Sequence, residues 1–146
     1  MAEAGRFGVF ALPAVGLVAA PAGAQDEGRA RVHGAVDGRV TQETIQRTIC
    51  QRGYTASVLP PRVFTDAAKR RLMNGHGGSR SDYELDHLIP IGLGGHPTSS
   101  SNLWLQPWPA AAMKDRDELR LHRDVCAGRM TLDEAQREML AVWGPR

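Results

Sequence analysis

The stretch YELDHLIPIGLGG, residues 83–95, decides the fold, and it is followed by a polar loop and the segment NLWLQ at residues 102–106. Asp86 and His87 stand together in its first half, shortly before a proline and a glycine interrupt the apolar run. Apolar and aromatic residues bounded by Gly, Pro and Ser clusters predict one strand over residues 83–89 and another over residues 102–106. Two strands form a sheet that is too small to be stable alone, so flanking helices must complete the core.

Helical patterns flank the two strands on both sides. We expect one helix to begin at Thr41 and end at Gly53, and a second to cover residues 65–73. After the strands, a long helix is expected over residues 110–126. A Thr-x-x-Glu capping box at residues 131–134 begins a last helix, with apolar residues on one face. The sequence therefore predicts an α+β domain, with a two-stranded antiparallel sheet and a helix as its core and further helices at both ends. On the last helix, the residues expected on the apolar face are Leu132, Ala135, Met139 and Val142.

The first 24 residues resemble a secretory signal peptide. Residues 7–20 are apolar and uncharged, and an Ala-Gly-Ala site at residues 22–24 precedes a polar segment. The apolar run is short for a membrane span, so cleavage after Ala24 is expected, with an uncleaved anchor as the alternative. Residues 25–39 are then expected to be a flexible leader and residues 40–146 one folded domain. The mature protein should be periplasmic or secreted, without a membrane segment.

The composition limits which partners and which kinds of metal site the sequence can indicate. The chain has 146 residues and a formal net charge of +2, so its charge alone does not indicate a nucleic-acid partner. The basic cluster at residues 69–71 fits either a solvated helix face or a contact with phosphate, and the three tryptophans fit either core packing or base stacking. Cys50 and Cys126 are the two cysteines, which excludes a cysteine-built zinc ribbon. In an exported protein they are expected to form one disulfide.

Polar side chains in and after the strands suggest a reactive site. The imidazole of His87 can take a proton near neutral pH, although a buried structural histidine is the alternative. Asp86 and Asn102 could equally be turn residues. On the following helix Asp115 and Glu118 share one face, which a solvated surface would also explain. Carboxylate, imidazole, amide and a second carboxylate are the groups that metal-assisted phosphodiester hydrolysis requires.

The segment from residue 83 to residue 118 resembles the HNH, or ββα-metal, endonuclease superfamily. The resemblance rests on Asp-His followed by Pro, a Gly-Gly loop, Asn-Leu, and a carboxylate on the next helix. Residues 40–143 resemble small exported bacterial proteins of that type. The motifs that carry this wider resemblance are VTQETIQRTIC at residues 40–50, NLW at residues 102–104, Lys114-Asp115 and VCAG at residues 125–128.

The resemblance implies metal-dependent hydrolysis of nucleic acid by a monomeric, non-specific endonuclease, with DNA favoured over RNA as the substrate. His87 would be the general base that activates water. Asn102 would orient the site, and Lys114 would lie near the scissile phosphate.

The resemblance also implies a divalent metal held by Asp86, with Asp115 and Glu118 as further ligands on the helix. Hard oxygen ligands favour Mg²⁺ or Mn²⁺ over Zn²⁺. Ala111 stands where some members carry another ligand, which leaves the metal fewer protein groups. Two alternatives remain open: a non-catalytic exported binding or structural protein on the ββα scaffold, and a metal-binding hydrolase of another substrate.

Overall fold

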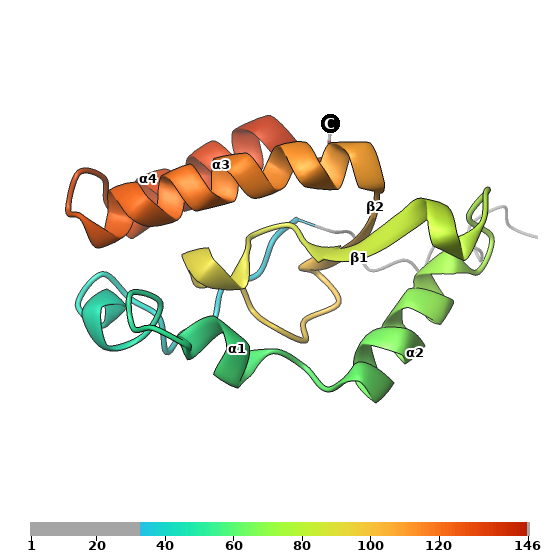
Figure 1. The fold of residues 1–146 in the computed structure, drawn as a ribbon, viewed down its shortest axis with the longest axis horizontal. Helices are drawn as coiled ribbons and strands as arrows, with labels where there is room; N and C mark the ends of the chain where they lie inside the picture. The colour runs from blue at the N-terminus through green and yellow to red at the C-terminus, as the bar shows by residue number, and fades with distance from the viewer. Residues whose placement is uncertain (1–32, 146) are drawn as a thin grey trace, which may run out of the picture.

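The computed structural model describes residues 33–145 (Figure 1). The expected signal peptide, residues 1–24, lies outside the described residues. Within them the fold is a two-stranded antiparallel hairpin packed against a long helix, with further helices, which confirms the predicted class. No helix in this part of the chain is long and apolar enough to cross a membrane. The helices and strands are α1 (Tyr54–Val58), α2 (Arg62–Met73), β1 (Tyr83–His87), β2 (Leu103–Pro107), α3 (Trp108–Cys126) and α4 (Leu132–Trp143), with 3₁₀ helices η1 (Ile45–Arg47), η2 (Arg80–Asp82) and η3 (Ile91–Leu93).

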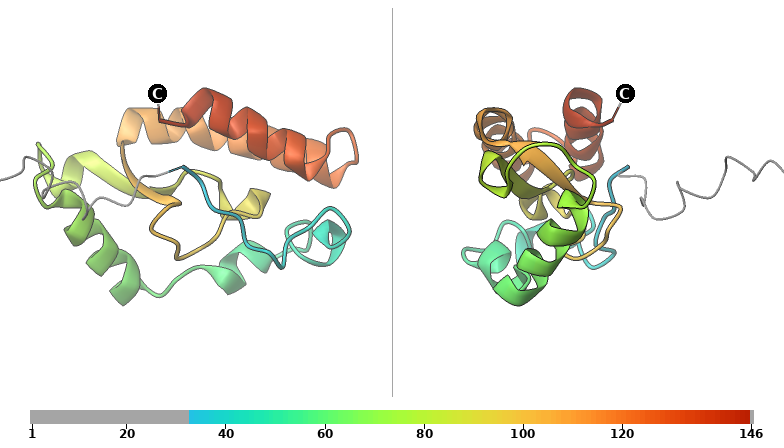
Figure 2. Two further views of the ribbon diagram at one scale, coloured as in Figure 1. Left: turned by 180° about the vertical axis from the view of Figure 1, so that it is seen from behind. Right: turned by 90° about the vertical axis from the view of Figure 1, so that its right-hand side faces the viewer.

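The hairpin lies between α3 on one side and α2 on the other (Figures 1 and 2). Strands β1 and β2 pair in a register that places Glu84 opposite Gln106 and Asp86 opposite Trp104. Directly opposed residues of an antiparallel pair lie on the same face, so these four side chains share the face toward α3. At the α2 side, the Lys69 ammonium donates to the backbone oxygen at the start of β1 over 2.6 Å.

The two C-terminal helices form where local signals favour them. Pro109 stands in the first turn of α3, where its missing N–H costs nothing. For α4 the predicted capping box is confirmed: the Thr131 hydroxyl accepts from the Glu134 N–H, and the Glu134 carboxylate accepts from the Thr131 N–H. The predicted apolar face of α4 is confirmed except at its end, because Val142 is 53% exposed.

The core lies where α4 and the inner part of α3 meet η3 and the N-terminal turns. Its buried members are Val40, Ile45, Ile49, Ile89, Leu93, Leu121, Val125, Leu132, Ala135 and Met139. At one edge of this core a disulfide joins Cys50 to Cys126, with 5.5 Å between the two Cα atoms. The predicted pairing of the two cysteines is present in the structure.

The helix predicted from Thr41 to Gly53 does not form; only the short η1 and turns occupy this segment. Threonine hydroxyls explain the difference, because they bond to nearby backbone oxygens and compete with helical hydrogen bonds. The Thr44 hydroxyl donates to the carbonyl of Arg39, and the Thr48 hydroxyl donates to the carbonyl of Thr44. The apolar residues of the segment are nevertheless buried as predicted.

Other element ends also differ from expectation. Helix α1 was not predicted, and α2 begins at Arg62, three residues before the expected start, because Pro61 supplies the extended backbone of its N-terminal cap. Strand β1 ends at His87 rather than at Ile89, where the backbone turns into η3. Strand β2 and helix α3 agree with their predicted positions within two residues.

The described part of the expected flexible leader, residues 33–39, packs on the domain. The Ala35 carbonyl accepts from the His96 N–H over 2.7 Å, and the Asp37 N–H donates to the Gly94 carbonyl over 2.8 Å. Gly95 permits this close packing, because a Cβ there would lie 1.7 Å from the backbone oxygen of Ile89, two residues after β1. Backbone hydrogen bonds therefore hold residues 33–39 against the loop after η3, where a flexible leader was expected, and the rest of the expected leader, residues 25–32, lies outside the described residues.

Candidate functional site

A buried ion pair joins the hairpin to α3. The Lys114 side chain is 0% exposed, and its Nζ lies 2.9 Å from Oδ2 of Asp86. The two groups meet at ion-pair distance but without the angles of a hydrogen bond, and neither atom has another partner. The short separation makes this an ion pair, because charge attraction depends on separation far more than on angle. The other oxygen of Asp86 accepts the N–H of His87 over 2.7 Å.

His87 leaves β1 on the face opposite to Asp86, as expected for consecutive strand residues. Its Nε2 lies 2.8 Å from the backbone oxygen of Pro97. Since a carbonyl oxygen only accepts, Nε2 carries the hydrogen, and Nδ1 is the acceptor of the neutral ring. Burial lowers the pKa of His87, although the Pro97 bond and the charge of Asp86 act in the opposite direction. The imidazole is therefore neutral at pH 7 and able to take a proton at Nδ1.

Asn102 is fully buried and holds the loop that supports His87. Its side-chain oxygen accepts from the Ile89 N–H, and its amide nitrogen donates to the carbonyls of Ile89 and His96, all within 3.1 Å. The same oxygen also lies 3.4 Å from the backbone nitrogen of Ala35. Pro97, the acceptor for His87, directly follows this clamped segment. Asn102 thus fixes the loop rather than touching the imidazole itself.

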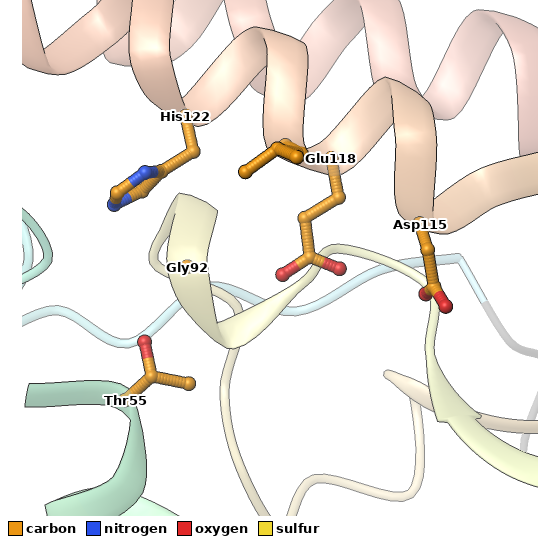
Figure 3. Close-up of a pocket in the computed structure, with 6 residues that line it drawn as sticks. Thr55, Gly92, Asp115, Glu118 and His122 are labelled. Atoms are coloured by element: carbon orange, nitrogen blue, oxygen red, sulfur yellow. The ribbon is translucent and has the colours of Figure 1, made fainter. Parts of the chain in front are cut away.

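A cavity of about 330 Å³ separates α3 from η3 and α1 (Figure 3). Asp115 and Glu118 extend into this region from α3, and the Glu118 carboxylate points toward the η3 turn. One of its oxygens lies 3.1 Å from the position that a Cβ on Gly92 would take, so the glycine leaves room for it. His122 also lines the cavity, with its Nε2 2.9 Å from the backbone oxygen of Ile49.

The charges of Asp86 and Asp115 act on Glu84 and Glu118, and we call these four residues the carboxylate cluster. Burial raises the pKa of Glu118 to about 7, and Asp86 and Asp115 push it in the same direction while Lys114 opposes them. Burial likewise raises the pKa of Glu84, again with contributions from Asp86 and Asp115. Burial therefore favours the protonated forms of Glu84 and Glu118, and the nearby Lys114 ammonium favours their charged forms.

The expected metal site does not fit this arrangement. Both oxygens of Asp86 are already engaged, by the His87 N–H and by Lys114. Among residues 33–145, no group of three or more His, Cys, Asp or Glu side chains is placed to hold a metal ion. Ala111 is buried and offers no ligand. A metal held jointly by Asp86, Asp115 and Glu118 would require these side chains to move.

Two residues of the site, Glu84 and Gln106, were missed in the sequence, and Trp104 was considered only for core packing or base stacking. Glu84 belongs to the carboxylate cluster, and strand periodicity counted back from Asp86 identifies it. Gln106 is 2% exposed with both side-chain polar atoms unpartnered, and the indole N–H of Trp104 is also buried without a partner. Both face α3 through their pairing with β1. No sequence pattern marked Gln106 as buried, because glutamine is usually exposed.

Comparison of the chain with known protein families, curated proteins and solved structures finds no match. The geometry of the hairpin and α3 is therefore the basis for a functional proposal.

Proposed function

We propose that this protein hydrolyses phosphodiester bonds of nucleic acid, DNA in preference to RNA, at the end of β1. The observation that supports the proposal is the state of His87. A carbonyl oxygen fixes its Nε2 as a donor, burial keeps the ring neutral, and Nδ1 is left as a proton acceptor. A positioned neutral imidazole of this kind is the most common general base in enzymes.

In the proposed reaction, Nδ1 of His87 takes a proton from a water molecule whose oxygen forms a bond to phosphorus. The opposite P–O bond breaks, and the leaving oxygen takes a proton from solvent. Asn102 keeps the loop rigid, so that the Pro97 carbonyl holds the ring in one orientation. Mg²⁺ or Mn²⁺ as a cofactor stays a prediction, and no step is assigned to it because the carboxylates do not form its site.

The Asp86–Lys114 ion pair favours a second candidate function. It neutralises the carboxylate that a nuclease of this kind is expected to use for metal, which suits a non-catalytic binding module on the same scaffold. We place either activity in the periplasm or outside the cell. The Cys50–Cys126 disulfide supports an oxidising compartment.

The purified protein should be incubated with plasmid DNA in the presence of Mg²⁺, Mn²⁺, Zn²⁺ or EDTA. For a nuclease we expect wild-type cleavage, and His87→Ala should reduce its rate by roughly 10²–10⁴-fold. The matched control is His76→Ala, which removes a histidine whose ring packs edge-on against Tyr83. The control should cut like wild type.

The pH profile adds a second measurement. Because burial holds the pKa of His87 below its ordinary value of 6.5, the wild-type rate should fall only below that pH. Equal rates for His87→Ala and wild type would remove the nuclease assignment. DNA binding without cleavage under all four conditions would support the non-catalytic module instead.

A further inference from the structure

Trp108 is the exposed member of the three tryptophans of this chain. It begins α3 and is 51% exposed, whereas Trp104 and Trp143 are partly buried. The indole N–H of Trp108 donates to the backbone oxygen of Ser81 over 2.8 Å, which orients the ring against η2. An indole has no other hydrogen-bonding group, so Trp108 offers only the surface of its ring to a partner.

Three exposed arginines lie on the segments that meet at this end of the hairpin (Figure 1). Arg80 directly precedes Ser81, the residue that holds the indole. Arg70 and Arg71 belong to the last turn of α2, and Lys69 of the same turn joins α2 to the start of β1. Within the part of the chain that the structure describes, none of the three arginines forms an ion pair. Their guanidinium groups are therefore available to an anionic partner.

The helix dipole explains part of this charge pattern. Basic residues are favourable in the last turn of a helix, which accounts for Arg70 and Arg71. It accounts neither for Arg80, which lies in η2, nor for an exposed ring that a hydrogen bond orients. Asp82, the acidic residue of η2, accepts the Ser79 N–H in a capping box, so one carboxylate stands against three arginines. We call Trp108, Arg70, Arg71 and Arg80 the tryptophan–arginine surface.

We infer that the tryptophan–arginine surface binds single-stranded DNA, with the indole stacked on a base and the arginines in contact with phosphates. Every nucleobase has a flat face, and an aromatic ring beside cationic groups is the combination that binds single strands without sequence preference. Guanidinium groups also suit phosphate contacts. The five residues of β1 span about 13 Å, so the surface and His87 lie at opposite ends of one strand. The choice of DNA as the partner rests on the proposed function.

Binding of a fluorescently labelled oligothymidine strand, measured in EDTA at several salt concentrations, tests the inference. Wild type should bind the strand, and its Kd should rise with salt because phosphate contacts release counterions. Trp108→Ala should raise the Kd by about 5–150-fold, the effect of losing one stacked base. Trp108→Phe should keep most of the affinity, because phenylalanine also stacks. Arg80→Gln should weaken binding and reduce the slope of log Kd against log salt concentration by about 0.7, the value for one phosphate contact on a single strand.

Two variants of α3 serve as matched controls. Met113→Ala removes another exposed apolar side chain, which is 59% exposed. Arg123→Gln removes an exposed arginine from the last turn of α3 and changes the net charge by the same amount as Arg80→Gln. Both controls should bind the strand like wild type.

The inference is overturned if wild type does not bind the strand, or if folded Trp108→Ala binds it like wild type. Tighter binding of a duplex or of an RNA strand of the same length would also overturn it. If Trp108→Ala does not fold, Arg80→Gln decides: a loss no larger than that of Arg123→Gln would contradict the inference. The plasmid assay answers separately for hydrolysis. Binding that depends on Trp108 without cleavage would retain this surface and remove the nuclease, and cleavage that depends on His87 with binding independent of Trp108 would do the reverse.

Discussion

Replacing Glu118 by glutamine tests the electrostatics of the cavity between α3 and η3. Burial is the largest cause of the rise in the pKa of Glu118 from 4.5 to about 7. One pKa unit corresponds to about 1.4 kcal/mol, so ionisation of Glu118 costs the folded state up to about 3 kcal/mol. Residual contact with water reduces this cost, and we expect about 1–3 kcal/mol.

The sign of the pH dependence follows from the direction of the shift. A folded-state pKa above the unfolded value means that the folded state binds this proton more tightly. The stability contributed by the protonated group is fully present below the unfolded pKa of 4.5 and is lost as pH rises through about 7. Glutamine carries no charge at any pH. Glu118→Gln should therefore match wild type near pH 4.5 and exceed its free energy of unfolding by about 1–3 kcal/mol near pH 8.

Urea unfolding with the disulfide intact, at several pH values between about 4.5 and 8.5, measures this difference. The matched control is Asp66→Asn on α2, which removes a carboxylate that is 44% exposed and lies 3.7 Å from Arg62 one turn away. The control should stay within about 0.5 kcal/mol of wild type. A gain for Glu118→Gln that is the same at every pH, or no gain near pH 8, would refute the reasoning. Lys114 or solvent would then compensate the Glu118 charge.

Three further predictions concern the framework of the site. Free-thiol labelling of denatured, non-reduced protein should find neither Cys50 nor Cys126 reactive, and reduction should lower the free energy of unfolding by about 4 kcal/mol; two labelled thiols would contradict this. Asn102→Ala should cost at least about 2 kcal/mol in urea unfolding, because buried backbone groups lose their partners; a smaller loss would mean that water replaces the amide. Gly95→Ala should abolish the folded circular dichroism spectrum, because its Cβ would overlap a backbone oxygen. Gly77→Ala, with open space around it, is the control, and equal stability of the two variants would argue against the packing described.

The order of elements could be predicted where the signals are local. The capping box at Thr131 and the proline at the start of α3 each act within one turn, and both helices lie where these signals place them. The segment from Thr41 to Gly53 shows the limit of such reasoning. Its apolar spacing matches a helix, but hydroxyl groups bond to the backbone and only the burial pattern was predicted correctly.

The sequence predicted which residues belong to the candidate site better than it predicted how they are arranged. Asp86 and His87 lie at the end of β1 as expected, but Lys114 was not expected in the interior. Lysine side chains are rarely buried, so the residue type alone predicts an exposed side chain at position 114. The period of α3 indicates the opposite, because Lys114 falls in line with the buried Leu121 and Val125. The contact of residues 33–39 with the loop after η3 could not be predicted, since backbone hydrogen bonds between distant segments carry no side-chain signal.

The disulfide has a consequence for proteolysis. It closes a covalent ring that contains α1, α2, the hairpin and α3, because its two cysteines lie 76 positions apart in the sequence. The turn at residues 74–79 is exposed, contains three glycines and lies inside this ring. A protease that cuts one bond there opens the ring without releasing a fragment. The nicked protein would run as one species on a non-reducing gel and as two after reduction, so after a single cut at this turn the disulfide still joins α1 and α2 to the hairpin and α3.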